Sequence, residues 1–373
     1  MKIDLVCGSY PPDVCGVADY TRLLARRLRD RGADARIVTT VGRDIACDAH
    51  VPAEALALNW SVRGAMQLAR RLRERASDVV HIQFPAKPYH GHMGVHILPL
   101  LLRSAAPRVV TTLHEYCMAP TGGRLKQLLN VRFSDCVIVT TDHDRDLIAR
   151  RCRKKQIHVI PIGSNIEPAG SEEEGLAILE ALGVPGGARV LVYFGFVRPG
   201  KGLEAAFRAL AHAPDDTVLA IVSADPDPAY KEKLMALSRD AGVESRIFWT
   251  GYLIEREVSS VMRAASAALL PYDDGATFRR GTLLAALGHG LPVVTTRSAA
   301  TPPALRHKEN VLMADPGDSG ALGALLHDLL SSPDYARSIS ERARVLGEQF
   351  SWDAIALKTL EVYSGLKVQD GRC

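Results

Sequence analysis

The sequence has few of the features that mark membrane, secreted or metal-binding proteins. It has no run of about 18 apolar residues and no signal peptide, so we expect neither a membrane-spanning helix nor export, and we expect a cytoplasmic protein. Its cysteines are odd in number and include no C-x-x-C pair, which favours reduced thiols over disulfides or a zinc site. Aromatic residues make up only 6% of the chain, and none lies within the arginine-rich segments. Nucleic acid is therefore not an expected partner.

Two signatures of nucleotide-binding enzymes are also missing. No G-x-G-x-x-G follows the first apolar segment, Lys2–Cys7, so an enzyme that binds a dinucleotide is disfavoured. Residues 195–201 spell GxxxxGK, but a P-loop needs Ser or Thr at the next position to hold magnesium, and this chain has Gly202 there. Pro199 also removes an amide donor that such a loop would use. A P-loop ATPase or kinase is the weakest of the alternatives.

The sequence does contain a repeated alternation of short apolar segments and amphipathic helical segments, which is typical of parallel sheets covered by helices. A chain of 373 residues is too long for one core. Near residues 161–174, which are rich in Pro, Gly, Ser and Glu, the charge changes sign from basic to acidic. We predict an α/β protein of two doubly wound domains, 1–165 and 166–350, with a last segment at 351–373. The predicted strands are Lys2–Cys7, Ala35–Thr40, Val79–Phe84, Arg108–Leu113, Cys136–Thr140, Ile157–Ile160, Arg189–Gly195, Thr217–Val222, Arg246–Thr250, Ala267–Leu270 and Leu291–Thr296.

The basic excess of the first half lies mainly in two helical segments, Leu23–Gly32 and Ala69–Ala76. Arginines on the polar face of a helix are most often simply solvated. The alternative is attraction to an anionic lipid headgroup or acceptor, with peripheral contact at the inner face of the membrane. Both interpretations stay open from the sequence.

The stretch Ala267–Thr296 combines two apolar segments, which predict buried strands, with one helix between them. The loop before this helix contains Asp273, Asp274, Arg279 and Arg280. A helix N-terminus presents unpaired amides and partial positive charge, so two arginines in this loop favour an anion such as phosphate. The alternative is that these arginines pair with the aspartates at the surface.

A second strand-to-helix loop, within Arg189–Glu204, carries Arg198 and Lys201. If both loops open on one cleft, their four cations can hold a diphosphate and stabilise it as a leaving group. Neither loop contains a D-x-D pair of carboxylates, so no metal site is predicted there. A nucleotide-diphosphate donor, bound at the carboxyl ends of the strands, is the leading hypothesis.

Seven segments, taken in order, resemble the retaining glycosyltransferases of family 4 (glycosyl transferases group 1). They are SYPPDVCGVADYT, TLHEY, IPIGSN, FGFVRPGKGLE, TGYL, LLAALGHGLPVV and FSWDAIALKTLEVY, and they extend over nearly the whole chain. The resemblance implies the GT-B fold, in which two Rossmann-like domains face each other across a cleft and the last segment crosses back to the first domain. It also implies a hexosyltransferase that moves a sugar, without a metal and with retention, from a nucleotide-diphosphate donor, with UDP-sugars favoured. The acceptor would be a hydroxyl of a sugar, a lipid-linked glycan or a small molecule.

The resemblance also implies roles for single residues. His114 matches the histidine that lies against the transferred sugar, with a hydrogen-bonded structural histidine as the alternative, and Lys201 matches the phosphate-binding lysine. Phe196 stands where the family usually has Arg, so Arg198 is expected to act from two residues on. The implied set is His114 and Asp274 as catalytic residues, and Gly16, Arg198, Lys201, Leu253, Arg280, Gly281, Thr282 and Leu283 as donor-binding residues, with no metal ligand and no cofactor.

The paired glutamates of the family's E-x7-E pattern are missing, because they fall on Thr277 and Ala285. In the family one glutamate usually grips sugar hydroxyls, and Asp274, nearer the helix start than Asp273, is its preferred replacement here. The other usually holds the ribose, and nothing obvious replaces it. A non-catalytic nucleotide-sugar binding protein is therefore the second hypothesis.

Three histidines, His90, His92 and His96, lie close together in KPYHGHMGVH. Their spacing matches no strong zinc pattern. We interpret the segment as a surface loop or an acceptor contact rather than a metal site.

Overall fold

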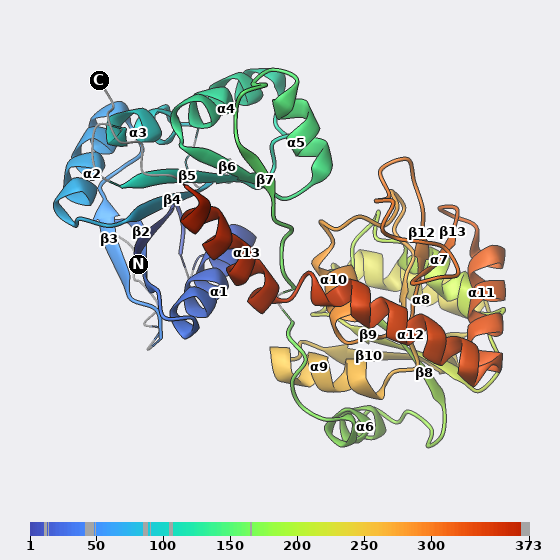
Figure 1. The fold of residues 1–373 in the computed structure, drawn as a ribbon. Helices are drawn as coiled ribbons and strands as arrows, with labels where there is room; N and C mark the ends of the chain where they lie inside the picture. The colour runs from blue at the N-terminus through green and yellow to red at the C-terminus, as the bar shows by residue number, and fades with distance from the viewer. Residues whose placement is uncertain are drawn as a thin grey trace. The chain divides into compact units, whose positions relative to one another are not determined.

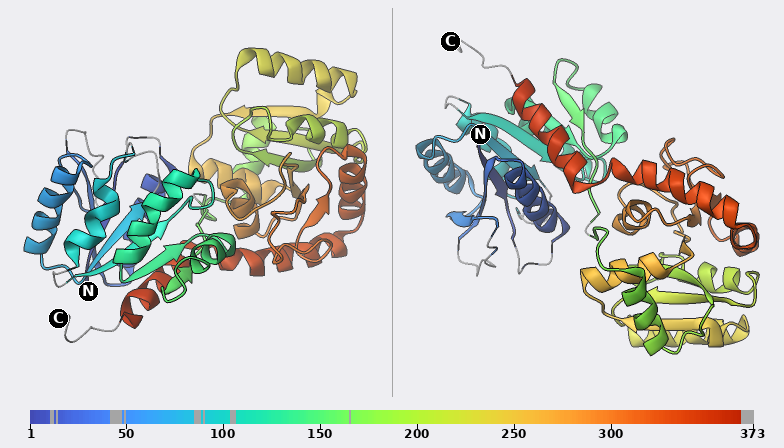
Figure 2. Two further views of the ribbon diagram at one scale, coloured as in Figure 1. Left: turned by 90° about the horizontal axis from the view of Figure 1, so that it is seen from above. Right: turned by 60° about the horizontal axis from the view of Figure 1, so that its bottom comes forward.

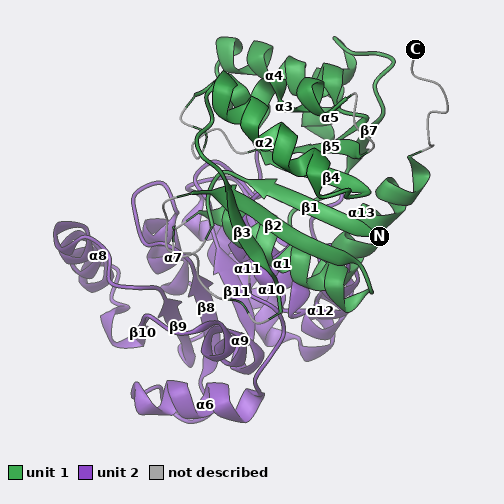
Figure 3. Ribbon diagram, turned by 90° about the vertical axis from the view of Figure 1, so that its left-hand side faces the viewer, with its two compact units in different colours: residues 1–162, 352–373 green, residues 163–351 purple. Residues whose placement is uncertain are grey.

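The computed structural model describes residues 1–10, 13, 15–41, 48, 50–84, 89, 91–103, 107–164 and 166–366. These residues form two compact units (Figure 3). Unit 1 contains Met1–Ile162 together with Trp352–Cys373, and unit 2 contains Gly163–Ser351. Each unit is a parallel sheet with helices packed against it (Figure 1). The prediction of two doubly wound α/β domains is therefore confirmed.

The sheet of unit 1 has seven strands in the order β3-β2-β1-β4-β5-β6-β7, and all neighbouring strands run parallel. Six of these strands lie where the apolar segments predict them, within a residue or two. The exception is β3, an edge strand with the sequence AEALA, which lacks the β-branched residues that predict strands. The strands are β1 (Lys2–Cys7), β2 (Asp34–Thr40), β3 (Ala53–Ala57), β4 (Val79–Phe84), β5 (Arg108–Leu113), β6 (Cys136–Val139) and β7 (Ile157–Val159).

Two hydrophobic cores lie on the two faces of this sheet, because side chains alternate along each strand. Ile3 and Leu5 of β1 point into one core and Val6 into the other. The first core is closed by α1 and α13, which lie side by side (Figure 2) although they come from opposite ends of the chain. The second is closed by α2, α3, α4 and α5. The helices are α1 (Gly16–Asp30), α2 (Val62–Glu74), α3 (Gly94–Leu102), α4 (Thr121–Phe133), α5 (Asp142–Ala149) and α13 (Trp352–Gly365).

The sheet of unit 2 has six parallel strands in the order β10-β9-β8-β11-β12-β13. Its strands are β8 (Arg189–Phe194), β9 (Thr217–Val222), β10 (Ile247–Gly251), β11 (Ala267–Leu270), β12 (Val293–Thr296) and β13 (Leu312–Ala314). Its helices are α6 (Glu172–Ala181), α7 (Leu203–Leu210), α8 (Pro228–Asp240), α9 (Glu255–Ala264), α10 (Gly281–Gly288), α11 (Ser319–Ser331) and α12 (Pro333–Glu348), with a short 3-10 turn at Glu244–Arg246. The edge strand β13, only three residues long, was not predicted.

The strand order places the ligand-binding position of each unit. In unit 2 the chain builds outward from β8 to β9 and β10, then returns to the other side of β8 with β11, β12 and β13. The sheet therefore has its topological switch point between β8 and β11, where open parallel sheets bind ligands at the carboxyl ends of the strands. In unit 1 the same reasoning places the switch point between β1 and β4.

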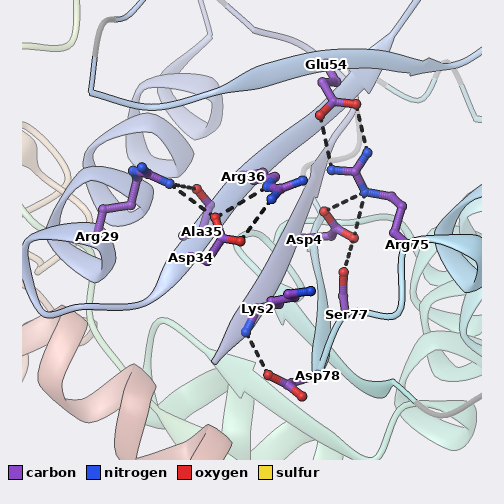
Figure 4. A network of polar contacts seen from close by, with 10 residues as sticks. All are labelled: Lys2, Asp4, Arg29, Asp34, Ala35, Arg36, Glu54, Arg75, Ser77 and Asp78. Atoms are coloured by element: carbon purple, nitrogen blue, oxygen red, sulfur yellow. Dashed lines mark hydrogen bonds and ion pairs between the residues drawn. The ribbon is translucent and has the colours of Figure 1, made fainter.

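Many of the arginines that make unit 1 basic have partners within the fold. At the amino edge of the sheet, Arg75 binds both Asp4, which is 1% exposed, and Glu54 (Figure 4). Other arginines form ion pairs: Arg27 with Asp30, Arg29 and Arg36 with Asp34, Arg31 with Asp353, and Arg70 with Glu74. Arg71 and Arg73 donate hydrogen bonds to the backbone carbonyls of Leu56 and Leu101. Carboxylates thus pair with several arginines of the two arginine-rich helical segments, and backbone carbonyls accept hydrogen bonds from Arg71 and Arg73.

In the part of the chain that the structure describes, no helix combines the length and the apolar character needed to cross a membrane.

Candidate functional site

The loops that follow β8 and β11 touch each other at the switch point of unit 2. Gly202 has φ +79°, and a Cβ at this position would lie 1.7 Å from the carbonyl oxygen of Pro271. Gly195 has φ +130°, and its Cβ would lie 2.8 Å from Cγ2 of Thr282. Only glycine fits this backbone conformation and this close approach. The glycines of the FGFVRPGKG segment therefore bring its loop against both ends of the loop that precedes α10.

This contact brings the predicted cations of the two loops together. Burial lowers the pKa of Lys201, and the nearby guanidinium groups of Arg280 and Arg198 lower it further, while Asp274 acts in the opposite direction. The charges of Arg198 and Arg280 are thus close enough to Lys201 to act on it. The loop contact therefore brings three of the four cations of the diphosphate hypothesis to the same part of unit 2.

The guanidinium group of Arg280 makes one ion pair and one contact with an aromatic ring. Its guanidinium binds the carboxylate of Asp274 and lies 4.8 Å from the ring centroid of Tyr272. The hydroxyl of Tyr272 lies 2.6 Å from Oγ1 of Thr282, in the first turn of α10. Asp273 makes no hydrogen bond or ion pair with any described residue. The surface-pairing alternative is therefore correct for Arg280, and it exists beside the cation cluster.

The amide groups at the start of α10 face the same location. Gly281, Thr282 and Leu283 occupy the first turn, where backbone N–H groups have no acceptor within the helix. Arg280 is the N-cap residue, and its side chain makes no cap hydrogen bond. The helix thus adds amide donors and the positive end of its dipole to the three cations.

Leu253 follows β10 at the same edge of the sheet. β10 is separated from β8 by β9, so β10 lies two strand spacings, about 10 Å, from β8. This separation suits a ligand that extends from the phosphate position across the strand ends.

In unit 1, His114 follows β5 and is 7% exposed. Its Nε2 lies 2.8 Å from Oε1 of Gln83, and the ring of Tyr20 packs edge-on at 4.8 Å. Burial lowers the pKa of His114 to about 3, so the imidazole is neutral near pH 7. Because the amide oxygen of Gln83 can only accept, Nε2 carries the proton and Nδ1 is left as an acceptor. His114 has the hydrogen bond of a structural histidine, and its Nδ1 is the atom able to bind a sugar hydroxyl.

Gly16, the other predicted residue of unit 1, is the first residue of α1. A Cβ at this position would meet no atom within 4 Å, so no close packing within the fold explains the glycine. It lies beyond the carboxyl end of β1, which borders the switch point of the sheet. An approaching ligand could therefore reach its backbone.

A second buried histidine, His81, lies beside His114 and makes acid sensitivity a testable property of unit 1. Its ring nitrogens bind the hydroxyls of Tyr363 and Thr112, at 2.6 and 2.7 Å. Burial, and then the neighbouring His114, lowers the pKa of His81 to about 3. Because the unfolded chain binds the proton first, the stabilisation is present above pH 6.5 and is lost as the pH falls towards 3.

We expect the free energy of unfolding to fall by roughly 2 kcal/mol for each of these two histidines between pH 7 and pH 5. Urea unfolding at both pH values would measure this loss. The variant His81→Gln, which cannot titrate, should show a smaller pH dependence than the wild-type protein. An unchanged pH dependence would show that His81 does not contribute.

The three-histidine segment does not form a metal site among the residues that the structure describes. His96 is buried on α3 and packs against the ring of Phe84 at 5.0 Å. His92 is exposed, and His90 lies outside the described residues. The described histidines, cysteines and carboxylates nowhere form a group of three able to hold a metal.

Comparison with known proteins assigns the family. The model of Glycosyltransferase Family 4 matches residues 14–167, and that of Glycosyl transferases group 1 matches residues 188–332. The chain belongs to glycosyltransferase family 4.

Curated relatives of this chain include proteins that are named for inositol derivatives. A D-inositol 3-phosphate glycosyltransferase of Xylanimonas cellulosilytica is 25% identical over 254 residues, which are 66% of this chain but only 60% of that protein. The match thus spans less than two thirds of this relative's length. A phosphatidyl-myo-inositol mannosyltransferase of Mycobacterium leprae is 24% identical over 99% of both chains.

Solved structures with similar folds include glycosyltransferases of the GT-B type. A glycosyltransferase from Rickettsia africae has a TM-score of 0.77 at 17% identity, with 98% of both chains covered. The Anabaena protein Alr3699/HepE, in complex with UDP, has a TM-score of 0.74 at 20% identity, with 98% of this chain and all of that chain covered. At these identities the comparisons establish the GT-B fold.

The departures from the family pattern have structural consequences in this chain. Ala285 is fully buried on α10 and offers no carboxylate at the position of the second glutamate. Phe196, at 77%, and Arg198 are both exposed, and Val197 between them is buried. Thr277 is half-buried, in the loop that also holds the Asp274–Arg280 pair.

Sequence reasoning missed two residues of this site, Tyr272 and Glu204. Tyr272 carries Arg280 on its ring; its position directly before the two aspartates was the available signal. Glu204 accepts a hydrogen bond of 2.8 Å from Tyr230 and, after burial, is the main cause of the raised pKa of Asp273. No local pattern indicated that contact, because β9, α8, β10, α9 and β11 lie between Glu204 and the aspartates along the chain.

Proposed function

We propose that this protein transfers a sugar from a nucleotide-diphosphate donor to a hydroxyl acceptor, with retention at the anomeric carbon and without an essential metal. The observation that carries the proposal is the contact, at the switch point of unit 2, between the two loops that hold Arg198, Lys201 and Arg280. A departing nucleoside diphosphate carries several negative charges. Fixed cations and helix amides stabilise that charge as it develops.

In the proposed reaction, the three cations bind the diphosphate together with the amides at the start of α10, those of Gly281, Thr282 and Leu283. The base lies near Leu253, and Gly16 lets the backbone of unit 1 approach the donor. Asp274 accepts hydrogen bonds from sugar hydroxyls, and neutral His114 offers Nδ1 to another hydroxyl. A donor phosphate oxygen takes the proton of the acceptor hydroxyl as the new glycosidic bond forms and the bond to the diphosphate breaks.

UDP-sugars are the proposed donors and inositol-like or lipid-linked hydroxyl compounds the proposed acceptors. Both assignments rest on similarity: Alr3699/HepE was solved with UDP, and two relatives are named for inositol phosphate and phosphatidyl-inositol. Incubation with UDP-, GDP- and ADP-sugars, with release of the nucleotide as the measurement, tests the activity. The anomeric configuration of the product, from NMR, tests retention, and activity that EDTA abolishes and magnesium restores would contradict the metal-free mechanism.

A non-catalytic nucleotide-sugar binding protein is the second candidate, favoured by the absence of both family glutamates at Thr277 and Ala285. Such a protein would bind the donor tightly and release no nucleotide with any acceptor. A P-loop enzyme would instead hydrolyse ATP in a magnesium-dependent reaction.

We also propose that unit 1 makes peripheral contact with anionic membranes from the cytoplasmic side, but through other residues than the arginine-rich helices. Among the described residues, five exposed cations near the ends of α4 and α5 make no ion pair: Arg132, Arg150, Arg151, Arg153 and Lys154. Each unpaired cation near an anionic bilayer contributes about 1 kcal/mol to binding. Sedimentation with phosphatidylglycerol vesicles, compared with phosphatidylcholine vesicles, tests this, and equal binding to both would contradict it.

A further inference from the structure

Arg280, a cation of the proposed phosphate site, already forms an ion pair with a carboxylate of the protein itself, that of Asp274. Asp274 also lies close enough to Lys201 to act on its charge. One carboxylate therefore offsets two of the three cations that would bind a diphosphate. A diphosphate and this carboxylate compete for the same guanidinium.

The two partners of this pair are held very differently. The Arg280 side chain is 18% exposed and lies on the ring of Tyr272, which is itself tied to α10 through Thr282. The Asp274 side chain is 69% exposed, and Arg280 is its only hydrogen-bond or ion-pair partner among the described side chains. An incoming anion would therefore displace the carboxylate and leave the guanidinium in place.

We propose that Asp274 is an internal counter-anion that the donor diphosphate displaces from Arg280, and that the displaced carboxylate then binds hydroxyls of the donor sugar. This inference rests on the proposed function and deepens it. It makes Asp274 a specificity-determining residue. A nucleoside diphosphate without its sugar displaces the carboxylate and gains no hydroxyl contact in return, whereas the complete donor gains both.

The same exchange favours product release. Once the sugar has moved to the acceptor, Asp274 loses its hydroxyl partners and competes again for Arg280. As Asp274 pairs with Arg280 again, the nucleoside diphosphate loses a cationic partner and dissociates more readily. The ion pair thus weakens product binding more than donor binding.

The test compares diphosphate affinity and turnover in Asp274→Asn. Because the competing charge is removed, we expect the Kd for UDP to fall about fivefold to tenfold, with stronger product inhibition, while kcat with the sugar donor falls. Asp273→Asn is the matched control, since Asp273 makes no ion pair among the described residues; it should change the UDP affinity less than about twofold. Isothermal titration and initial rates measure both quantities.

A double-mutant cycle separates direct exchange from a general electrostatic effect. In the Arg280→Gln background, Asp274→Asn should no longer tighten UDP binding. Persistence of the gain in that background, or weaker UDP binding by Asp274→Asn alone, overturns the inference. If none of UDP, GDP and ADP binds the wild-type protein, the proposed function itself fails; if one binds and the cycle shows no coupling, only the inference fails.

Discussion

Replacing Lys201 with alanine is expected to lower turnover about 100-fold or more, the loss typical of a group that stabilises developing charge in the transition state. Lys201 is partly buried, and the charges of Arg198 and Arg280 act on it, so its removal leaves the diphosphate with fewer charged partners as the bond to the sugar breaks. The effect should appear in kcat with the preferred donor, measured as released nucleotide.

Lys201→Arg is the control for this prediction, because it keeps the positive charge and should retain part of the activity. Thermal unfolding of both variants would show whether the fold is intact. Near wild-type turnover in a correctly folded alanine variant would mean that Lys201 does not contact the leaving group. The site would then have to be sought outside these two loops.

Replacing Gly202 with alanine adds only one methyl group, and we expect it to damage the site more than any other substitution of that size. The residue has φ +79°, and the new Cβ would lie 1.7 Å from the carbonyl oxygen of Pro271. Backbone cannot yield at this contact without separating the loops after β8 and β11. We expect a stability loss of about 3 kcal/mol or more and loss of diphosphate binding.

Gly200→Ala is a matched control in the same loop. Gly200 has φ +84°, but a Cβ there would meet nothing within 4 Å. It should cost only about 1 kcal/mol, the penalty of the left-handed conformation. Urea unfolding and UDP titration of both variants would separate the effect of the contact with Pro271 from that of the backbone conformation. Equal effects would show that the loop contact at Gly202 is unimportant.

Most strands could be predicted because their apolar residues are consecutive and bounded by turn residues. The two that were missed, β3 and β13, are edge strands whose sequences, AEALA and LMA, carry little strand signal. They exist because a neighbouring strand offers hydrogen-bond partners: β2 pairs with β3 and β12 with β13. These strand pairings are tertiary contacts, and no local sequence pattern predicts them.

For the charged residues too, some features could be predicted from the sequence and others could not. Arg198, Lys201 and Arg280 could be singled out because each lies in a strand-to-helix loop with glycines nearby. Apart from the pairing of Arg280 with an aspartate of its own loop, the partners of the charged groups could not be predicted. The arginine-rich helices were candidates for an anionic surface, yet much of their charge is paired with carboxylates such as Asp4 and Asp34.

The sequence by itself determined the alternation of strands and helices, and the placing of cations and glycines in two of the connecting loops. These properties depend on residues near one another in the chain. Only the tertiary structure decided that β8 and β11 are neighbours, that Gly202 packs against Pro271 and that Asp274 binds Arg280. Strand order and the contact between the two loops are set by the packing of the whole unit, because each joins segments that lie far apart in the chain. The pairing of Asp274 with Arg280 is local, and the structure decided it among the alternatives that the sequence left open.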